Sequence, residues 1–223
     1  VDIVCHGTPS PLLWSDHLKS LEKKHKSKIK NIRFRTKITG WHSHVEKVDF
    51  ENGKSDYTSV FSQTNVFLFY SHLAQRPSCY QCIYTNMVRK SDITIGDFWG
   101  IENAMPQFDD NKGVSLVLIN SLKGELIFSK ALDKLEVRIS NPEACIQSQG
   151  QLKSPIEMPY CRKEFWNDYH QYGYDYIIRK YTNYNAKGFT KSAIKKILRK
   201  MGLLEITKNL IKKSKTMPII KEK

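Results

Sequence analysis

The chain has 223 residues, of which 40% are hydrophobic, so it is long enough to bury a core. Five cysteines are too few for a secreted disulfide scaffold, and neither a membrane-spanning apolar run nor a signal-peptide pattern occurs. The net charge of +14 is concentrated in residues 187–223, with twelve basic and two acidic side chains, against 24 basic and 20 acidic elsewhere. Because the aromatic residues lie mostly outside that basic segment, the pattern argues against nucleic-acid binding.

The first element predicted along the chain is a helix. Ser10 provides a helix cap, and Pro11 occupies the first helical position, where its missing N–H costs nothing. Trp14, Leu18 and Leu21 follow at helical spacing, so this face is expected to be buried.

The remainder of the body predicts short strands and helices. Strand patterns occur at residues 29–37, 45–50, 57–61, 92–95, 113–120 and 136–139, and Asn52-Gly53 predicts a hairpin turn between the second and third of them. Helical patterns occur at 66–74, 123–135 and 164–181. The last is broken near Gly173 and is dense with aromatic side chains, which are expected to pack in the core, and the stretch after Pro142 predicts a loose connection. The stretch GVSLVLIN at 113–120 is almost wholly apolar and predicts a strand buried on both faces. We therefore expect an α+β fold, with a mixed β-sheet core and flanking helices over residues 1–184 and a basic amphipathic helical tail over residues 185–223.

The cysteines are the most informative side chains. Cys79 and Cys82 lie in SCYQC, a C-x2-C loop of the kind that structural zinc, iron–sulfur and redox sites all use. Composition alone favours a buried structural thiol for Cys5. Cys145 and Cys161 stand alone without ligand-like neighbours and are expected to be structural. A reducing, cytoplasmic location is expected, with cysteines serving as free thiols or metal ligands.

Five stretches together resemble a known family. VDIVCHGTPSPLLW, FRTKITGW, RPSCYQC, RKSDITIGDFWG and DDNKGVSLVLIN are similar, in order and spacing, to the C-terminal region of the coenzyme F420 hydrogenase/dehydrogenase beta-subunit family. The similarity covers about residues 1–139 and continues more weakly to residue 181. It implies a flavoprotein with FAD and a [4Fe–4S] cluster, which passes hydride-derived electrons between a deazaflavin or another substrate, flavin and iron–sulfur centres.

The resemblance implies that Cys5, Cys79 and Cys82 are three of four cluster ligands. The family's fourth ligand lies in a Gly-Thr-Pro-Cys stretch upstream of this sequence, which agrees with a chain that begins inside an apolar run without Met. Because a [4Fe–4S] cube normally takes four thiolates, three imply an exchangeable iron corner or no stable cluster. Zinc with an outside ligand is the alternative.

The matching stretches also supply candidate flavin-binding residues. Glycine-containing loops let backbone N–H groups approach a ligand, and basic side chains can face a phosphate or the flavin ring. The G-x-G-x-x-G dinucleotide fingerprint is absent, so FAD binding would be of the family's own type. No residue is assigned to proton transfer. The expected cofactor-binding residues are Arg35, Lys37, Gly96, Asp97, Gly100, Lys112, Gly113 and Ser115.

The sequence thus predicts an FAD- and [4Fe–4S]-dependent oxidoreductase whose partner is a ferredoxin-like segment or subunit with iron–sulfur centres. The tail places Ile194, Ile197, Leu198 and Met201 opposite lysines, which suits an anionic membrane surface or a docking partner. The competing hypothesis is a zinc-stapled, non-enzymatic docking module that uses this basic helix to bind a partner or membrane. Iron with sulfide would favour the first hypothesis, and zinc the second.

Overall fold

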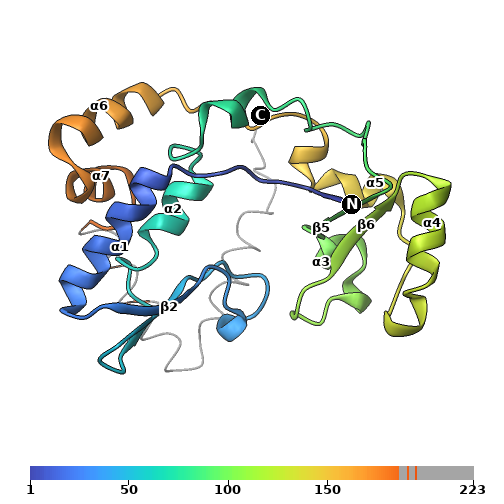
Figure 1. Ribbon diagram of the computed structural model, residues 1–223, viewed down its shortest axis with the longest axis horizontal. Helices are drawn as coiled ribbons and strands as arrows, with labels where there is room; N and C mark the ends of the chain where they lie inside the picture. The colour runs from blue at the N-terminus through green and yellow to red at the C-terminus, as the bar shows by residue number, and fades with distance from the viewer. Residues whose placement is uncertain (186–189, 191–193, 195–223) are drawn as a thin grey trace, which may run out of the picture.

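The computed structural model describes residues 1–185, 190 and 194, and its elements form two lobes side by side (Figure 1). The first lobe packs helices against an antiparallel sheet with strand order β2-β3-β4. Its elements are α1 (Pro11–His25), β2 (Ile29–Arg33), β3 (Lys47–Phe50), β4 (Ser55–Asp56), α2 (Thr64–Tyr70), α6 (Arg162–Tyr172) and α7 (Tyr174–Tyr181).

The second lobe is built on a mixed sheet of order β1-β5-β6, in which β1 runs parallel to β5 and β6 runs antiparallel to it. Its elements are β1 (Asp2–Ile3), β5 (Ile93–Asp97), α3 (Ile101–Ala104), β6 (Ser115–Ile119), α4 (Leu122–Ser129) and α5 (Pro142–Gln147). Short 3-10 turns complete the fold: η1 (Lys37–Thr39), η2 (Pro77–Gln81), η3 (Pro106–Phe108), η4 (Leu132–Lys134) and η5 (Gly150–Leu152). The α+β fold class predicted from the sequence is confirmed.

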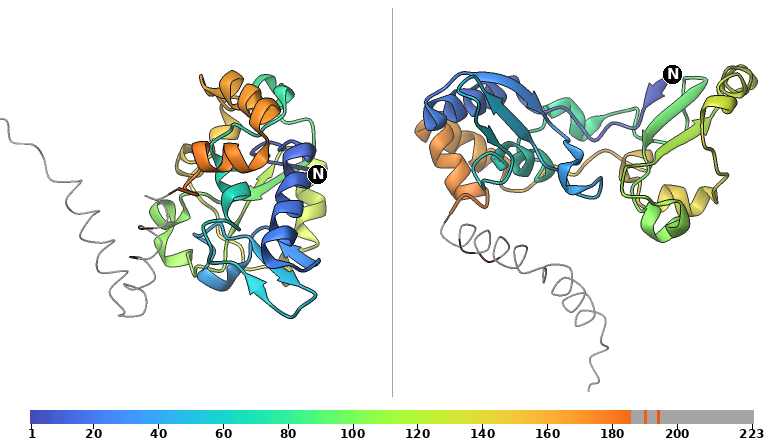
Figure 2. Two further views of the ribbon diagram at one scale, coloured as in Figure 1. Left: turned by 90° about the vertical axis from the view of Figure 1, so that its left-hand side faces the viewer. Right: turned by 90° about the horizontal axis from the view of Figure 1, so that it is seen from below.

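Three connections run between the lobes, as the view from below makes clear (Figure 2). The segment after β1 leads into α1, the stretch from α2 to β5 carries the paired thiols, and the stretch from α5 leads into α6. Both ends of the thiol-bearing stretch are therefore anchored in regular structure, one end in each lobe.

Helix α1 begins at Pro11, as predicted. Its buried side chains are Leu13, His17 and Leu21. Burial of Leu21 agrees with the prediction, but Leu13 and His17 are buried where Trp14 and Leu18 were expected. The helix ends at His25, and the capping residue Lys26, whose N–H donates to the carbonyl of Glu22, has a left-handed backbone (φ 50°) that turns the chain away.

The predicted break near Gly173 is also confirmed, because a glycine with φ 79° separates α6 from α7. Phe165, Tyr169 and Tyr174 of these helices are buried in the core of the first lobe, whereas Tyr172 and Tyr176 are 53% and 39% exposed. The core role predicted for this aromatic group is therefore confirmed for the first three side chains and not for the other two.

Three strand predictions are wrong in detail. Residues 57–61 form no strand; the returning strand is the two-residue β4 just before them, because the Asp56 carboxylate accepts hydrogen bonds from the N–H groups of Thr58 and Ser59 and turns the chain. Strand β6 is not buried throughout: Leu116 is buried, but Ser115 and Ile119 at its two ends are exposed. Residues 136–139 form no strand.

Helix α5 occupies a stretch that the sequence predicted to be a loose connection. The Asn141 side chain caps it by accepting a hydrogen bond from the N–H of Glu143 (2.8 Å). The predicted tail helix lies outside the described residues. Within residues 1–185, no helix is both long and apolar enough to cross a membrane.

Candidate functional site between the lobes

The segment that follows Cys5 lies beside the segment that leads to Cys79. Pro9 forms a β-bridge with Gln75, and the N–H of Arg76 donates to the carbonyl of Thr8 (3.0 Å). The N–H of Thr8 in turn donates to the sulfur of Cys79 at 3.3 Å. Residues far apart in sequence thus bring two thiol-bearing segments into contact, and one sulfur already accepts a backbone hydrogen bond.

The three candidate ligand thiols are free and reachable from the surface. Cys5 is exposed, so the buried thiol that composition alone favoured is wrong, and Cys79 and Cys82 are half-buried at the turn formed by η2. Among the described residues, however, no group of three His, Cys, Asp or Glu side chains is close enough to hold a metal ion. The thiols therefore supply suitable donor chemistry on neighbouring segments, but their side chains would have to converge to bind one centre.

A row of aromatic rings runs from the residue after Cys5 into the contact between the lobes. The interlobe ring row consists of His6, Tyr70, His44, Trp99 and Trp41, in that order. Successive ring centroids are 5.2, 4.6, 4.8 and 4.8 Å apart. Its two face-to-face stacks are Tyr70 on His44 and Trp99 on Trp41. The row fixes the thiol segment relative to the far end of the site through rigid side chains.

At the far end of the row lies a small polar pocket of about 130 Å³, formed by the loop after β2 and by the end of β5. Arg35 forms an ion pair with Asp97 across the two lobes. The guanidinium of Arg35 also lies over the Trp99 ring at 5.0 Å, a cation–π contact. The pocket is lined by Arg35, Thr36, Lys37, Gly40, Trp41, Ser43 and Asp97. It contains three predicted cofactor-binding residues.

The loop before β6 holds this pocket in place. The side-chain oxygen of Asn111 accepts a hydrogen bond from the N–H of Trp41 (2.8 Å), and His42 pairs with Asp109 (2.7 Å). Gly113, at φ 101°, lies so close to the Trp41 indole that a Cβ atom would overlap the ring. Gly113 is thus required for the close contact between the lobes.

The other predicted cofactor-binding residues lie around this pocket without lining it. Gly96 packs against Val4 and Gly100 against Ser148, so both permit close approach of protein segments. Lys112 is exposed and pairs with Asp110. Ser115 lies opposite Asp97 in the β5–β6 ladder and lines a second, larger cavity.

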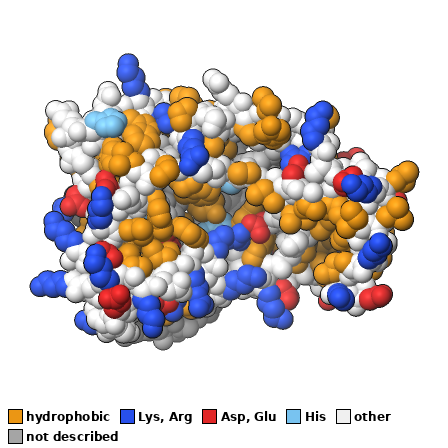
Figure 3. Space-filling view, viewed as in Figure 1, with side chains coloured by type: hydrophobic (Ala, Val, Ile, Leu, Met, Phe, Trp, Pro, Cys, Tyr) orange, Lys and Arg blue, Asp and Glu red, His pale blue; other side chains and the backbone are white. Residues whose placement is uncertain are grey.

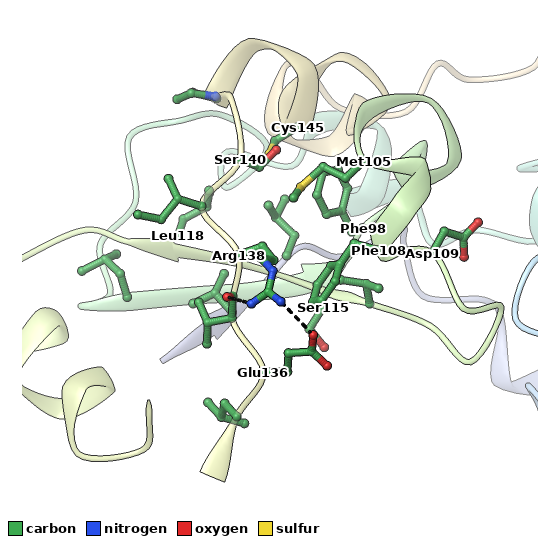
Figure 4. A pocket seen from close by; sticks show the side chains of 18 of the residues that line it. Phe98, Met105, Phe108, Asp109, Ser115, Leu118, Glu136, Arg138, Ser140 and Cys145 are labelled. Carbon is green, nitrogen blue, oxygen red and sulfur yellow. Dashed lines mark hydrogen bonds and ion pairs between the residues drawn. The ribbon is translucent and has the colours of Figure 1, made fainter. Parts of the chain in front are cut away.

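That larger cavity is a groove of about 890 Å³ between β6, the segment 135–140, the η3 turn and α5. Phe98, Met105 and Phe108 gather along one side of it, and Arg138 donates a hydrogen bond to Glu136 on its own segment (Figure 4). The groove is lined by three acidic side chains, Asp109, Asp110 and Glu136, and by one basic side chain, Arg138. The size of this groove suits a cofactor, but its mostly acidic lining disfavours a phosphate group, which the smaller pocket of Arg35 and Lys37 suits better.

The histidines of the site favour their neutral forms. Burial lowers the pKa of His44, with a further contribution from the Arg35 charge, and the Nε2 atom of His44 is buried without a hydrogen-bond partner among the described residues. Burial likewise lowers the pKa values of His6 and His72, whose Nε2 atoms lie 3.2 Å apart. Figure 3 shows a hollow between the lobes, with apolar and histidine side chains in its depth and charged groups beside it.

Sequence reasoning missed the residues that build the ring row. Trp41 and Trp99 lie inside the matching stretches ITGW and GDFWG, but the residues predicted there to bind a cofactor were glycines and charged neighbours. His44 and Tyr70 carried no local signal, because they meet each other across 26 residues of sequence and His44 meets Trp99 across 55. An aromatic residue next to a candidate loop glycine would have been a usable clue.

Comparison with known proteins identifies the family. Residues 1–144 match the family model for the C terminus of the beta subunit of coenzyme F420 hydrogenase/dehydrogenase. The match spans more than half of the chain, so the chain belongs to this family of redox enzyme subunits. No curated protein and no solved structure gives a match.

Proposed function

We propose that the chain is the electron-transferring domain of an FAD- and [4Fe–4S]-dependent oxidoreductase. The substrate class is a hydride donor or acceptor, a deazaflavin or another molecule, and the partner is a protein or segment with iron–sulfur centres. The observation that supports this best is the interlobe ring row, which joins the thiol segment to the pocket of Arg35, Lys37 and Asp97. Electron transfer between two cofactors requires such a fixed spacing.

In this proposal Cys5, Cys79 and Cys82 hold the cluster as thiolates. The N–H of Thr8, 3.3 Å from the Cys79 sulfur, stabilises negative charge there. The three free thiols fit the donor chemistry of such a cluster, and a fourth donor would complete it. Binding would require their side chains to converge.

Arg35 and Lys37 would bind a phosphate group of the dinucleotide. The pocket they line, about 130 Å³, takes one anionic group rather than a whole flavin, since ligand pockets for larger molecules occupy roughly 300–1,000 Å³. The Trp41 and Trp99 rings would exclude water from one side of the bound group. When bound, flavin supplies the conversion between a two-electron hydride and single electrons.

The test is anaerobic reconstitution of the chain with iron, sulfide and FAD, followed by desalting and measurement of retained iron, sulfide and flavin. We expect iron and sulfide together, with retention lost in the Cys79→Ala/Cys82→Ala variant. The matched control is Cys161→Ala, because Cys161 packs against the hydrophobic core of the first lobe. We expect Arg35→Ala/Lys37→Ala to retain the iron and lose the flavin.

The alternative to this proposal is a zinc-stabilised docking module without enzymatic activity. Zinc retained by Cys79 and Cys82, with neither sulfide nor flavin, would contradict a redox role. A chain that retains neither iron nor flavin under these conditions, even when an external thiol supplies the fourth ligand, would also contradict it.

A further inference from the structure

The turn directly after Cys82 presents a group of large apolar side chains to solvent. Ile83 is 75% exposed, Tyr84 66%, Met87 46% and Val88 77%. Single exposed apolar residues are common, but a contiguous group is a mark of an interaction surface. We name residues 83–88 the apolar turn.

Hydrogen bonds hold the backbone of the apolar turn in one conformation. The Thr85 hydroxyl donates to the carbonyl of Cys82 (2.7 Å), and the Asn86 side chain donates to the carbonyl of Ile83 (2.7 Å). Arg89, whose side chain is only 5% exposed, donates to the carbonyl of Tyr84 (2.6 Å) and to the carboxylate of Asp2 (2.7 Å). The turn is thus fixed to strand β1 while its apolar groups point outward, so little conformational entropy would be lost on binding.

The surroundings of the apolar turn are basic. Residues 57–91 contain no Asp or Glu, whereas Arg76 and Lys90 are exposed on either side of the turn. The nearby carboxylate of Asp2 is paired with Arg89. An apolar contact flanked by positive charge is complementary to an acidic protein surface, and such charges mainly increase the rate of association.

We propose that the apolar turn is the docking surface for an acidic electron-carrier protein, an inference that rests on the proposed function. Because the turn begins next to Cys82, a carrier bound here would lie close to the thiols through which electrons would pass. Tyr and Met are enriched at the centres of protein interfaces. A lipid surface is the weaker alternative, because lipid-binding clusters usually contain four to eight basic residues and this turn has two at its flanks.

The experiment measures direct binding of an oxidised acidic ferredoxin, as the probe, to the full chain by calorimetry at low ionic strength. Replacing Ile83 and Val88 together by Ser should weaken binding about tenfold or more, as removal of central contact residues does. Tyr84→Ser should weaken it as well. The matched control is Tyr172→Ser on α6, 53% exposed, which should leave binding unchanged. Added salt should weaken binding of the unmodified chain.

Equal binding by the Ile83→Ser/Val88→Ser variant, or no binding to the ferredoxin, would overturn the inference. Sedimentation with phosphatidylserine vesicles that depends on Ile83 and Val88, in place of ferredoxin binding, would also overturn it in favour of a membrane contact. Binding does not require loaded cofactors. If reconstitution fails but the chain still binds the ferredoxin through the apolar turn, only the proposed function is refuted. If reconstitution succeeds but the apolar turn does not contribute to ferredoxin binding, only the docking surface is refuted.

Discussion

The two lobes bury very different amounts of apolar side chain. Within the described residues, the core cluster of the first lobe contains thirteen buried residues, and the cluster centred on the second lobe contains six. One of those six, Trp41, comes from the loop after β2 of the first lobe. The second lobe therefore completes its core with a side chain borrowed from its neighbour.

The first lobe also contains a fully satisfied polar network. His17 and Glu46 are both completely buried and pair at 2.8 Å, and the other ring nitrogen of His17 lies 2.9 Å from the Tyr174 hydroxyl. The second Glu46 carboxylate oxygen accepts from Asn65 (3.1 Å). Such a network joins α1, α2, α7 and the loop before β3 in one arrangement.

The surface of the second lobe shows the opposite pattern. Ile3, Ile119, Leu122 and Ile139 are all more than 40% exposed. A lobe with a small core and an apolar surface gains stability from contacts outside itself, whereas a lobe with a large core and a closed network does not need them. We therefore expect stability to reside mainly in the first lobe, and the recognition proposed above to involve the second lobe and its connections.

The largest effect is expected when the buried network of the first lobe is broken. Glu46→Ala leaves buried His17 without its partner and should lower the free energy of unfolding by about 3–5 kcal/mol. Urea unfolding measures this loss. The control Glu102→Ala, on an exposed position of α3, should change stability by no more than about 0.5 kcal/mol. Similar losses in both variants would contradict the proposed difference between the lobes.

A smaller effect is expected where the lobes meet. Gly113→Ala should cost about 2–4 kcal/mol, because a left-handed backbone and overlap with the Trp41 indole both oppose it. Gly53 also has a positive φ, but a Cβ atom there would meet nothing within 4 Å, so Gly53→Ala should cost only about 1–2 kcal/mol. Urea unfolding of both variants, followed by tryptophan fluorescence, tests the difference. Equal costs would show that the Gly113–Trp41 contact contributes nothing.

The smallest effect is a pH dependence at the interlobe contact. The pKa of His44 is lower in the folded chain than its ordinary value of 6.5, first because of burial, so the fold favours the neutral ring. This stabilisation is complete above pH 6.5 and is lost as the pH falls through the lower folded-state pKa. Unfolding measured from pH 8 to pH 5 should show decreasing stability, and His44→Asn should reduce the slope. A slope unchanged by the substitution would contradict this assignment.

Local patterns predicted much of the fold. The start of α1 at Pro11, the turn at Gly53, strand β5 and the break at Gly173 were all placed correctly, because each depends on neighbouring residues and backbone preferences. Strand burial was predicted less well. The apolar run at 113–120 was expected to be covered on both faces, but both ends of β6 are exposed, because apolar composition does not show which side chains a neighbouring element will cover.

The candidate cofactor-binding residues were also only partly predicted. Arg35 and Lys37 come from one matching stretch and Asp97 from another, and all three line one pocket, but Lys112 and Gly100 do not line it. A sequence motif identifies a loop with suitable chemistry without giving the direction of its side chains. Whether Cys5, Cys79 and Cys82 act together stays a prediction that reconstitution will test.

By itself, the sequence determined the α+β class, the positions of the main turns and helix ends, and a supply of free thiols and basic loop residues. These follow from steric limits on the backbone and from apolar periodicity, which operate over a few residues. Only the tertiary structure decided that Arg35 pairs with Asp97, that rings from both lobes form one row, and that the apolar turn faces solvent. Those contacts arise because packing brings distant segments together, and no local preference specifies which side chains will then meet.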